Sequence, residues 1–287
     1  MPVTVVTDTT HYAPRELPGE EGIREVSLYV NYGEQHEREA DMPDYGAFYQ
    51  RLRELDHLPT TSQPSIGDFL EVYEPLAAAG QDVVSVHISG GISGTVESAR
   101  QAAQEAMAQH PERRVEVLDS RTACGALALC AMAGNAVARA GGDVDAVAGR
   151  VREAIESMKI WFAVDTLEFL RRGGRIGTAQ AWLGGALKIK PILTLDGEIT
   201  PIERVRTSGR AFERMVDYLK ARHEDGADGW VVQHIQAPDV AERLVERGRE
   251  VFGSEPVFVS EIGPVIGTHV GPGLLGVGGI PRRLLEA

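Results

Sequence analysis

Short apolar runs and longer amphipathic segments alternate along the first half of the chain. Val83 to Ile88 is an apolar run with the length of a buried parallel strand. Val96 to Met107 follows it with Ala, Gln, Glu and Met, which favour a helix. Val3 to Val6 and Val115 to Asp119 repeat the strand pattern. This alternation predicts a parallel sheet with helices on both faces.

The remaining elements of this half have clear boundary signals. Two prolines bracket the polar residues of 59–65, which favours an ordered loop with neither strand nor helix. Ser65 is a good N-cap for the next helix, with Asp68 in its first turn. The other predicted elements are a strand pair at Ile23 to Tyr32 and helices at Tyr45 to Leu55, Ile66 to Ala79 and after Thr122 to Ala140.

The pattern changes near residue 160. Asp196-Gly197 between two apolar runs is a strong hairpin signal. We predict strands at Ile160 to Val164, Lys188 to Leu193, Ile199 to Arg206, Trp230 to Ile235 and Pro256 to Glu261, a short helical turn at Thr166 to Leu170, and helices at Phe212 to Ala221 and Val240 to Phe252. Leu274 to Gly279 is apolar and glycine-rich, and we assign it no element.

These patterns predict an α/β protein of two domains. Residues 1–157 form a parallel α/β/α domain, and residues 158–287 form a smaller mixed-sheet α/β domain. In such parallel sheets, ligands bind beyond the carboxyl ends of the strands. Asp8, Thr61 and Ser93 are predicted to lie on or near such loops.

Composition narrows the class of partner. The 287 residues carry a net charge of −13, which argues against non-specific binding to nucleic acid or acidic membranes. A local basic patch and a transient membrane contact remain open.

The two cysteines, Cys124 and Cys130, match neither a zinc pair nor a redox pair, and we expect buried small residues in a reducing cytoplasm. No signal peptide is visible, so we expect a cytoplasmic location.

Ser93 follows the strand and glycine turn of residues 83–91 at the predicted start of a helix. Free backbone N–H groups and the helix dipole favour an anion at such a position. Ser93 has two interpretations, because Ser is also a preferred helix cap. No Walker lysine follows the turn, which argues against nucleotide binding of that type.

The sequence holds no convincing catalytic set. A Gly-x-Ser-x-Gly elbow is absent, and the eight histidines show no metal-ligand spacing. His269 lies beside a Gly-Pro-Gly turn and is either structural or part of a site with Thr61 and Ser93. The arginines of Arg171-Arg172-Gly173-Gly174-Arg175 form a basic cluster, which is either a solvated loop or an anion or partner contact.

Taken together, seven segments resemble the DegV family of bacterial fatty-acid-binding proteins, in family order and over residues 3–280. They are Asp8-Thr9-Thr10, Thr61 to Ser65, Ser89 with Ile92 to Thr95, Asp119-Ser120, Arg172 to Ile176, Lys190 to Leu193 and His269 to Gly273. His11-Tyr12 and Gly90 depart from the family's usual residues.

The resemblance implies a long-chain fatty acid, such as palmitate or oleate, bound in an apolar tunnel between the domains. It places the carboxylate-binding residues at Thr61, Ser93 and His269. It also implies a separate fatty acid kinase subunit, which binds ATP and phosphorylates the carboxylate to an acyl phosphate, a phospholipid precursor. On this view the chain is a lipid-binding carrier without a catalytic residue, a metal or another cofactor.

Three points remain open. We expect Arg172, Arg175 or Arg206 to contact the kinase partner. The alternative function is a serine hydrolase or acyltransferase that uses Ser93 as nucleophile and His269 as base, and a lipid-responsive regulator without a kinase is a third. Acyl chain length, saturation preference and oligomeric state are not predicted.

Overall fold

The computed structural model describes residues 1–14, 17, 22–42, 44–54, 58–183 and 189–287. Its first sheet is parallel, with the strand order β2-β1-β6-β7. Its strands are β1 (Val3–Asp8), β2 (Arg24–Val26), β6 (Asp82–His87) and β7 (Val115–Asp119). The parallel sheet predicted from the apolar runs is confirmed.

The second sheet has six strands in the order β10-β9-β8-β13-β11-β12 and is mixed. Its strands are β8 (Lys159–Ala163), β9 (Lys190–Asp196), β10 (Glu198–Val205), β11 (Gly229–His234), β12 (Phe258–Glu261) and β13 (Leu275–Ile280). The hairpin at Asp196-Gly197 is confirmed. No element was predicted for β13, yet it lies in the interior of this sheet, between β8 and β11.

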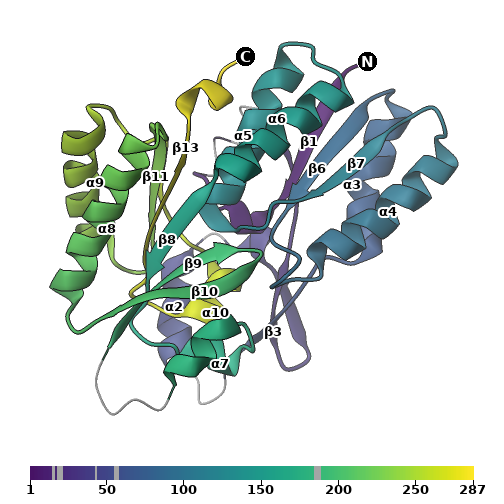
Figure 1. Cartoon of the computed structure of the whole chain (residues 1–287). Coiled ribbons are helices and arrows are strands. Elements are labelled where there is room, and N and C mark those ends of the chain that lie inside the picture. Colours follow the sequence, from purple (N-terminus) through teal and green to yellow (C-terminus); the bar gives the residue numbers. More distant parts are fainter. Residues whose placement is uncertain (15–16, 18–21, 43, 55–57, 184–188) are drawn as a thin grey trace.

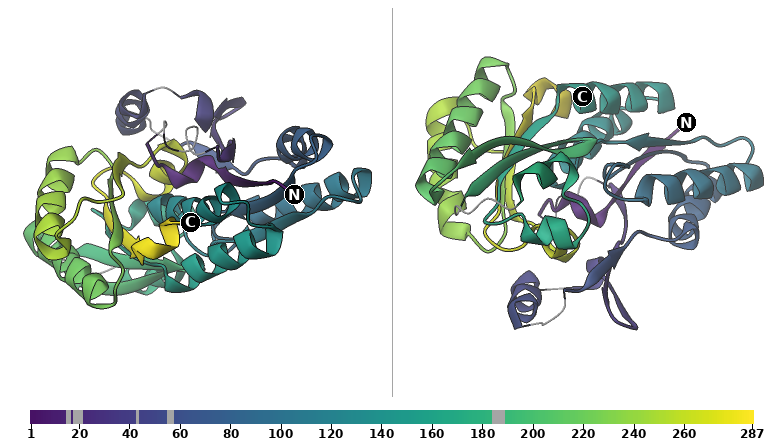
Figure 2. Two further views of the ribbon diagram at one scale, coloured as in Figure 1. Left: turned by 90° about the horizontal axis from the view of Figure 1, so that it is seen from above. Right: turned by 60° about the horizontal axis from the view of Figure 1, so that its bottom comes forward.

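A third, small antiparallel sheet joins β3 (Tyr29–Tyr32), β4 (Gln35–Arg38) and β5 (Thr60–Ser62). Here the loop predicted for residues 59–65 is wrong in part, because Thr60–Ser62 pairs with β3. The flanking prolines do not prevent this pairing, since the three strand residues lie between them and keep their N–H groups. Figure 2 shows this sheet and α2 (Tyr45–Glu54) to one side of the larger sheets.

Helices cover both faces of the larger sheets (Figure 1). They are α3 (Ile66–Ala78), α4 (Thr95–Gln109), α5 (Cys124–Arg139), α6 (Val144–Ser157), α7 (Glu168–Arg172), α8 (Ser208–Glu224), α9 (Pro238–Phe252) and α10 (Pro264–Val270), and the 3-10 turns are η1 (Thr9–His11), η2 (Glu39–Asp41), η3 (Gly177–Trp182) and η4 (Arg282–Leu285). The Ser65 cap is confirmed as a capping box with Asp68. Residues Leu55 and Lys188 of two predicted elements lie outside the described residues.

Helix α5 lies between the two larger sheets and contacts β1 and β6 of one and β11 and β13 of the other. Its core residues Leu127 and Leu129 are fully buried, and its Ala and Gly content keeps the packed layer thin. One hydrophobic cluster runs from Val5 in the first strand to Leu284 near the C-terminus. The boundary between residues 157 and 158 therefore stays a prediction.

Candidate ligand cavity

A cavity lies between the parallel sheet, the inner face of the six-stranded sheet and α10. Its volume is about 120 Å³. Because one water needs about 10–15 Å³ by a comparable measure, the cavity has room for a ligand many atoms long. The walls are mostly apolar and include Ile88, Ile92, Phe162, Leu195, Val231 and Leu274.

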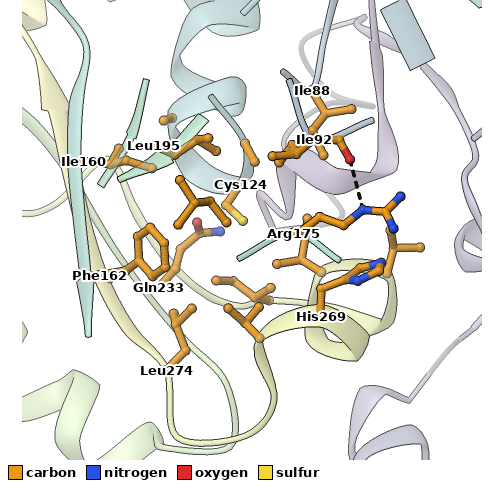
Figure 3. Close-up of a pocket in the computed structure, with 18 of the residues that line it drawn as sticks. Ile88, Ile92, Cys124, Ile160, Phe162, Arg175, Leu195, Gln233, His269 and Leu274 are labelled. Atoms are coloured by element: carbon orange, nitrogen blue, oxygen red, sulfur yellow. Dashed lines mark hydrogen bonds between the residues drawn. The ribbon is translucent and has the colours of Figure 1, made fainter. Parts of the chain in front are cut away.

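Arg175 and His269 lie at one end of this cavity, away from Ile160 and Phe162, whereas polar Gln233 lies near Phe162 (Figure 3). Thr61 Oγ1 lies 2.7 Å from His269 Nε2. Ser93 and Arg175 line the same cavity. Thr61, Ser93 and His269, which the sequence analysis grouped, therefore border one space, although they come from β5, the loop before α4 and α10.

The His269 ring is mostly buried. Burial, together with the nearby positive charge of Arg175, lowers the pKa of His269 to about 4. The ring is therefore neutral near pH 7. Its Nδ1 is buried and has no hydrogen-bond partner among the described residues, and it packs against Gly173, where a Cβ would overlap the ring.

Ser93 does not occupy the N-cap position of α4. The N-cap residue is Gly94, which makes no side-chain cap bond. Ser93 Oγ instead accepts a hydrogen bond of 3.3 Å from Thr95 N and lies 2.8 Å from Thr95 Oγ1. This hydroxyl lies just before the first turn of α4, at the positive end of the helix dipole, which is the setting predicted for an anion.

Arg175 is exposed at the mouth of the cavity. Its Nε donates a hydrogen bond of 3.3 Å to the Ile92 carbonyl, and its Nη1 donates one of 2.7 Å to the Gly173 carbonyl (Figure 3 shows the first). Arg172 instead lies 3.6 Å from Glu168 in an exposed ion pair. The predicted basic cluster is therefore divided, since only Arg175 of this pair borders the cavity.

Contacts between the two larger sheets bring these loops together. Ser89 Oγ donates a hydrogen bond of 2.6 Å to the carbonyl of Gly197, at the tip of the β9–β10 hairpin. Gly91 lies so close to this carbonyl that a Cβ would overlap it. The glycine turn after β6 thus permits a close backbone approach, which is a common reason for glycine at such positions.

Glu39, which sequence reasoning missed, holds the start of α10 through a hydrogen bond to its backbone. Its Oε1 accepts hydrogen bonds from Val265 N at 2.8 Å and from the Tyr12 hydroxyl at 2.7 Å, and its Oε2 accepts one from Thr9 at 2.7 Å. Burial raises the pKa of Glu39 to about 7, although these donors oppose the rise. No local signal in a polar stretch marks such a residue.

Gln233 is a second residue that was missed, and here a signal existed. It lies on β11 and lines the cavity, its Oε1 accepts a hydrogen bond from Gly125 N, and its Nε2 donates one of 2.9 Å to Ser260 Oγ. Alternation along residues 229–234 places Gln233 on the same face as Val231. A polar residue at an inward position of an apolar strand would have identified it.

The described part of the chain also bears on a metal site, a membrane-spanning helix and the two cysteines. Within it, no three His, Cys, Asp or Glu side chains are placed to hold a metal ion. No described helix is both long and apolar enough to cross a membrane. Both cysteines are free, and Cys130 is buried as expected. Cys124, also expected to be buried, is only partly buried, because it borders the cavity. Burial raises the pKa of both thiols.

Comparison with known sequences identifies the family. The model of one protein family, described as "Uncharacterised protein, DegV family", matches residues 2–282. A DegV domain-containing protein of Streptomyces coelicolor is 40% identical over 278 residues, which are 96% of this chain and 97% of that protein. The chain belongs to the DegV family, and the resemblance noted in the sequence is confirmed.

Solved structures of related proteins have the same fold. A DegV family protein of Thermus thermophilus, whose structure is described as showing fatty acid binding, has a TM-score of 0.87 and 35% identity, with 98% of this chain and 99% of that chain covered. DegV of Bacillus subtilis, described as a fatty acid binding protein, has a TM-score of 0.87 and 33% identity, with the same coverage. The two-domain α/β fold class predicted from sequence agrees with these matches.

Proposed function

We propose that this chain binds one long-chain fatty acid, such as palmitate or oleate, with the acyl chain in the cavity and the carboxylate at its polar end. One observation carries the proposal: a mostly apolar cavity is lined by Thr61, Ser93 and His269, with Thr61 and His269 in contact. The fatty acid binding described for the relatives from Thermus thermophilus and Bacillus subtilis supports it.

The apolar walls supply most of the affinity. Each buried methylene contributes about 0.8 kcal/mol, so a chain of C16 length can bind tightly without many polar contacts. The carboxylate still needs hydrogen-bond donors, because burying it without partners is costly. In this proposal the hydroxyls of Thr61 and Ser93 donate to it.

The neutral state of His269 determines what Thr61 can do. With its low pKa the ring carries one proton, and Nε2–H can donate to Thr61 Oγ1 across the 2.7 Å contact. The Thr61 hydroxyl hydrogen then remains available for the ligand carboxylate. Hydroxyl donors leave a carboxylate oxygen open to a phosphoryl donor, whereas an arginine bound to both oxygens would reduce its nucleophilicity.

We further propose that the bound carboxylate is presented to a separate ATP-dependent fatty acid kinase subunit, which converts it to an acyl phosphate. The chain then acts as a carrier and not as a catalyst. Exposed Arg175 at the cavity mouth, with Arg172 and Arg206, provides positive charge for docking an acidic partner surface.

The hydrolase alternative has little support from the geometry. His269 Nε2 is bonded to Thr61, and no carboxylate partners Nδ1 among the described residues, so the orienting group that a triad needs is missing. Ser85, His87 and Asp8 do form a Ser–His–Asp chain, with Oγ 2.6 Å from Nε2 and Nδ1 3.0 Å from Oδ2. All three are fully buried, so no substrate can reach them.

Calorimetric titration of delipidated protein tests the proposal. Palmitate or oleate should bind at one site, and hexadecanol, which has the tail but no carboxylate, should bind more weakly. Addition of a fatty acid kinase catalytic subunit with ATP should then yield acyl phosphate. Protein that ignores both acids would contradict the binding proposal, and binding without phosphorylation would contradict only the presentation step.

A further inference from the structure

Strand β13 has an unusual sequence for an interior strand. It reads Leu-Gly-Val-Gly-Gly-Ile and pairs with β8 on one side and β11 on the other. Glycine weakens a strand interior, and it often marks a place where a ligand or another backbone comes close. Each of its glycines therefore needs a physical reason.

The protein's own packing explains two of these glycines. A Cβ at Gly279 would lie 3.2 Å from the backbone oxygens of Ala227 and Gly229. A Cβ at Gly278 would lie 2.7 Å from Ile160 Cγ2. Neither position has free space for a side chain.

Gly276 is different, because the protein leaves room beside it. A Cβ there would meet its nearest neighbours, Phe162 Cβ and Leu274 Cδ2, at 3.5 and 3.6 Å, which are ordinary contact distances. Within β13, Gly276 is also the one residue that is not buried. Packing of the sheet therefore does not require glycine at this position.

The free space beside Gly276 is the cavity. Gly276 lines it and pairs with Gln233 on one side and Phe162 on the other, both of which also line it. Leu275 and Val277, its chain neighbours, pack into the cluster on the opposite face of the sheet. A side chain at position 276 would accordingly project into the cavity.

Gly276 also lies far from the polar end. Phe162 and Ile160, the β8 partners of Gly276 and Gly278, stand across the cavity from Arg175 and His269 (Figure 3). A fatty acid whose carboxylate lies at His269 would extend its methyl end toward Gly276.

We propose that Gly276 is a specificity-determining residue that sets the longest acyl chain the cavity accepts. The inference rests on the proposed function, since it names the part of the ligand that reaches this wall. The bare backbone at Gly276 leaves a groove in this wall, bordered by Gln233 on β11 and by Phe162 on β8. The last methylenes of the chain lie in this groove.

Binding of saturated acids from C12 to C18 by delipidated Gly276→Ala and Gly276→Val tests the proposal, with Gly149→Ala as the matched control. Gly149 is an exposed glycine of α6 with nothing within 4 Å of a Cβ. In the wild type and the control, affinity should rise about fourfold per methylene up to the limiting length. In Gly276→Ala the C18-to-C12 affinity ratio should fall at least fourfold with C12 binding unchanged, and in Gly276→Val it should fall further.

Phe162→Leu provides a second variant that does not depend on how the glycine variants fold. It removes bulk beside Gly276 and should move the limiting length to longer chains. An unchanged chain-length profile in folded Gly276→Val, or an equal loss at every length, would overturn the inference. A wild type that binds no acid would instead refute the proposed function, and this inference with it.

Discussion

Thr61 and His269 lie 208 positions apart in the chain, yet the Thr61 hydroxyl oxygen is 2.7 Å from His269 Nε2. This contact joins the small antiparallel sheet to α10 at the polar end of the cavity. In the tautomer that carries its proton on Nε2, the neutral ring donates to Oγ1 and directs the Thr61 hydrogen away from itself. The pair therefore prepares a donor for an anionic ligand.

Removing either hydroxyl should weaken binding of a fatty acid. Thr61→Ala or Ser93→Ala each deletes one charge-assisted hydrogen bond, and we expect a loss of about 1–3 kcal/mol in binding free energy. Thr61→Ser, which keeps the hydroxyl, is the control and should bind nearly as the wild type does. Titration with palmitate measures the effect, and full affinity in both alanine variants would remove these residues from the site.

His269 should make the protein less stable in acid. The pKa of this ring is about 4 in the folded chain and 6.5 when unperturbed, so the unfolded chain binds the proton more readily. The stability it contributes is present above pH 6.5 and is lost as pH falls toward 4, by up to about 3 kcal/mol. Denaturant unfolding at several pH values measures the free energy of unfolding of wild type and His269→Gln. The variant should lose less stability between pH 6.5 and pH 4, and an equal loss in both proteins would contradict the prediction.

Glu39 should act in the opposite direction. Its pKa is raised from 4.5 to about 7, so the folded chain holds this proton more tightly than the unfolded chain. Its contribution to stability therefore decreases as pH rises from 4.5 to 7. Glu39→Gln keeps an oxygen for Val265 N and should be less sensitive than wild type to this rise. Melting temperatures measured between pH 4.5 and pH 7 test this prediction. A steeper fall of the melting temperature in the variant than in wild type would contradict it.

Charge reversal should separate docking from binding. Arg172→Glu and Arg206→Glu change exposed side chains, and Arg172 does not border the cavity. We expect palmitate affinity to stay unchanged while acyl-phosphate formation by the kinase subunit is abolished. Glu168→Gln, which alters the ion-pair partner of Arg172, is the control and should retain phosphorylation. Normal phosphorylation in both arginine variants would argue against docking through these residues.

Local pattern predicted most elements, and the exceptions have physical causes. Val83 to Ile88 and the Asp196-Gly197 turn carry strong signals of strand and hairpin, and both were confirmed. Strand β13 was missed because three glycines remove the side chains that identify a strand. Helix α6 was not predicted, although Asp143 caps it.

The site was less accessible to sequence reasoning. The family resemblance selected Thr61, Ser93 and His269, and the structure places all three on one cavity. The Glu39–Val265 hydrogen bond joins residues 226 positions apart, and no local pattern encodes such a pairing. Gly276 was invisible for a related reason, since its importance lies in the space that it leaves.

Mass spectrometry of the purified, denatured protein tests the central claim most directly. If the cavity holds a fatty acid, the denatured sample should release one long-chain acid per protein molecule. The double variant Thr61→Ala with Ser93→Ala should retain less of it. A wild-type protein that carries no acid, and takes up none from added palmitate or oleate, would contradict the account.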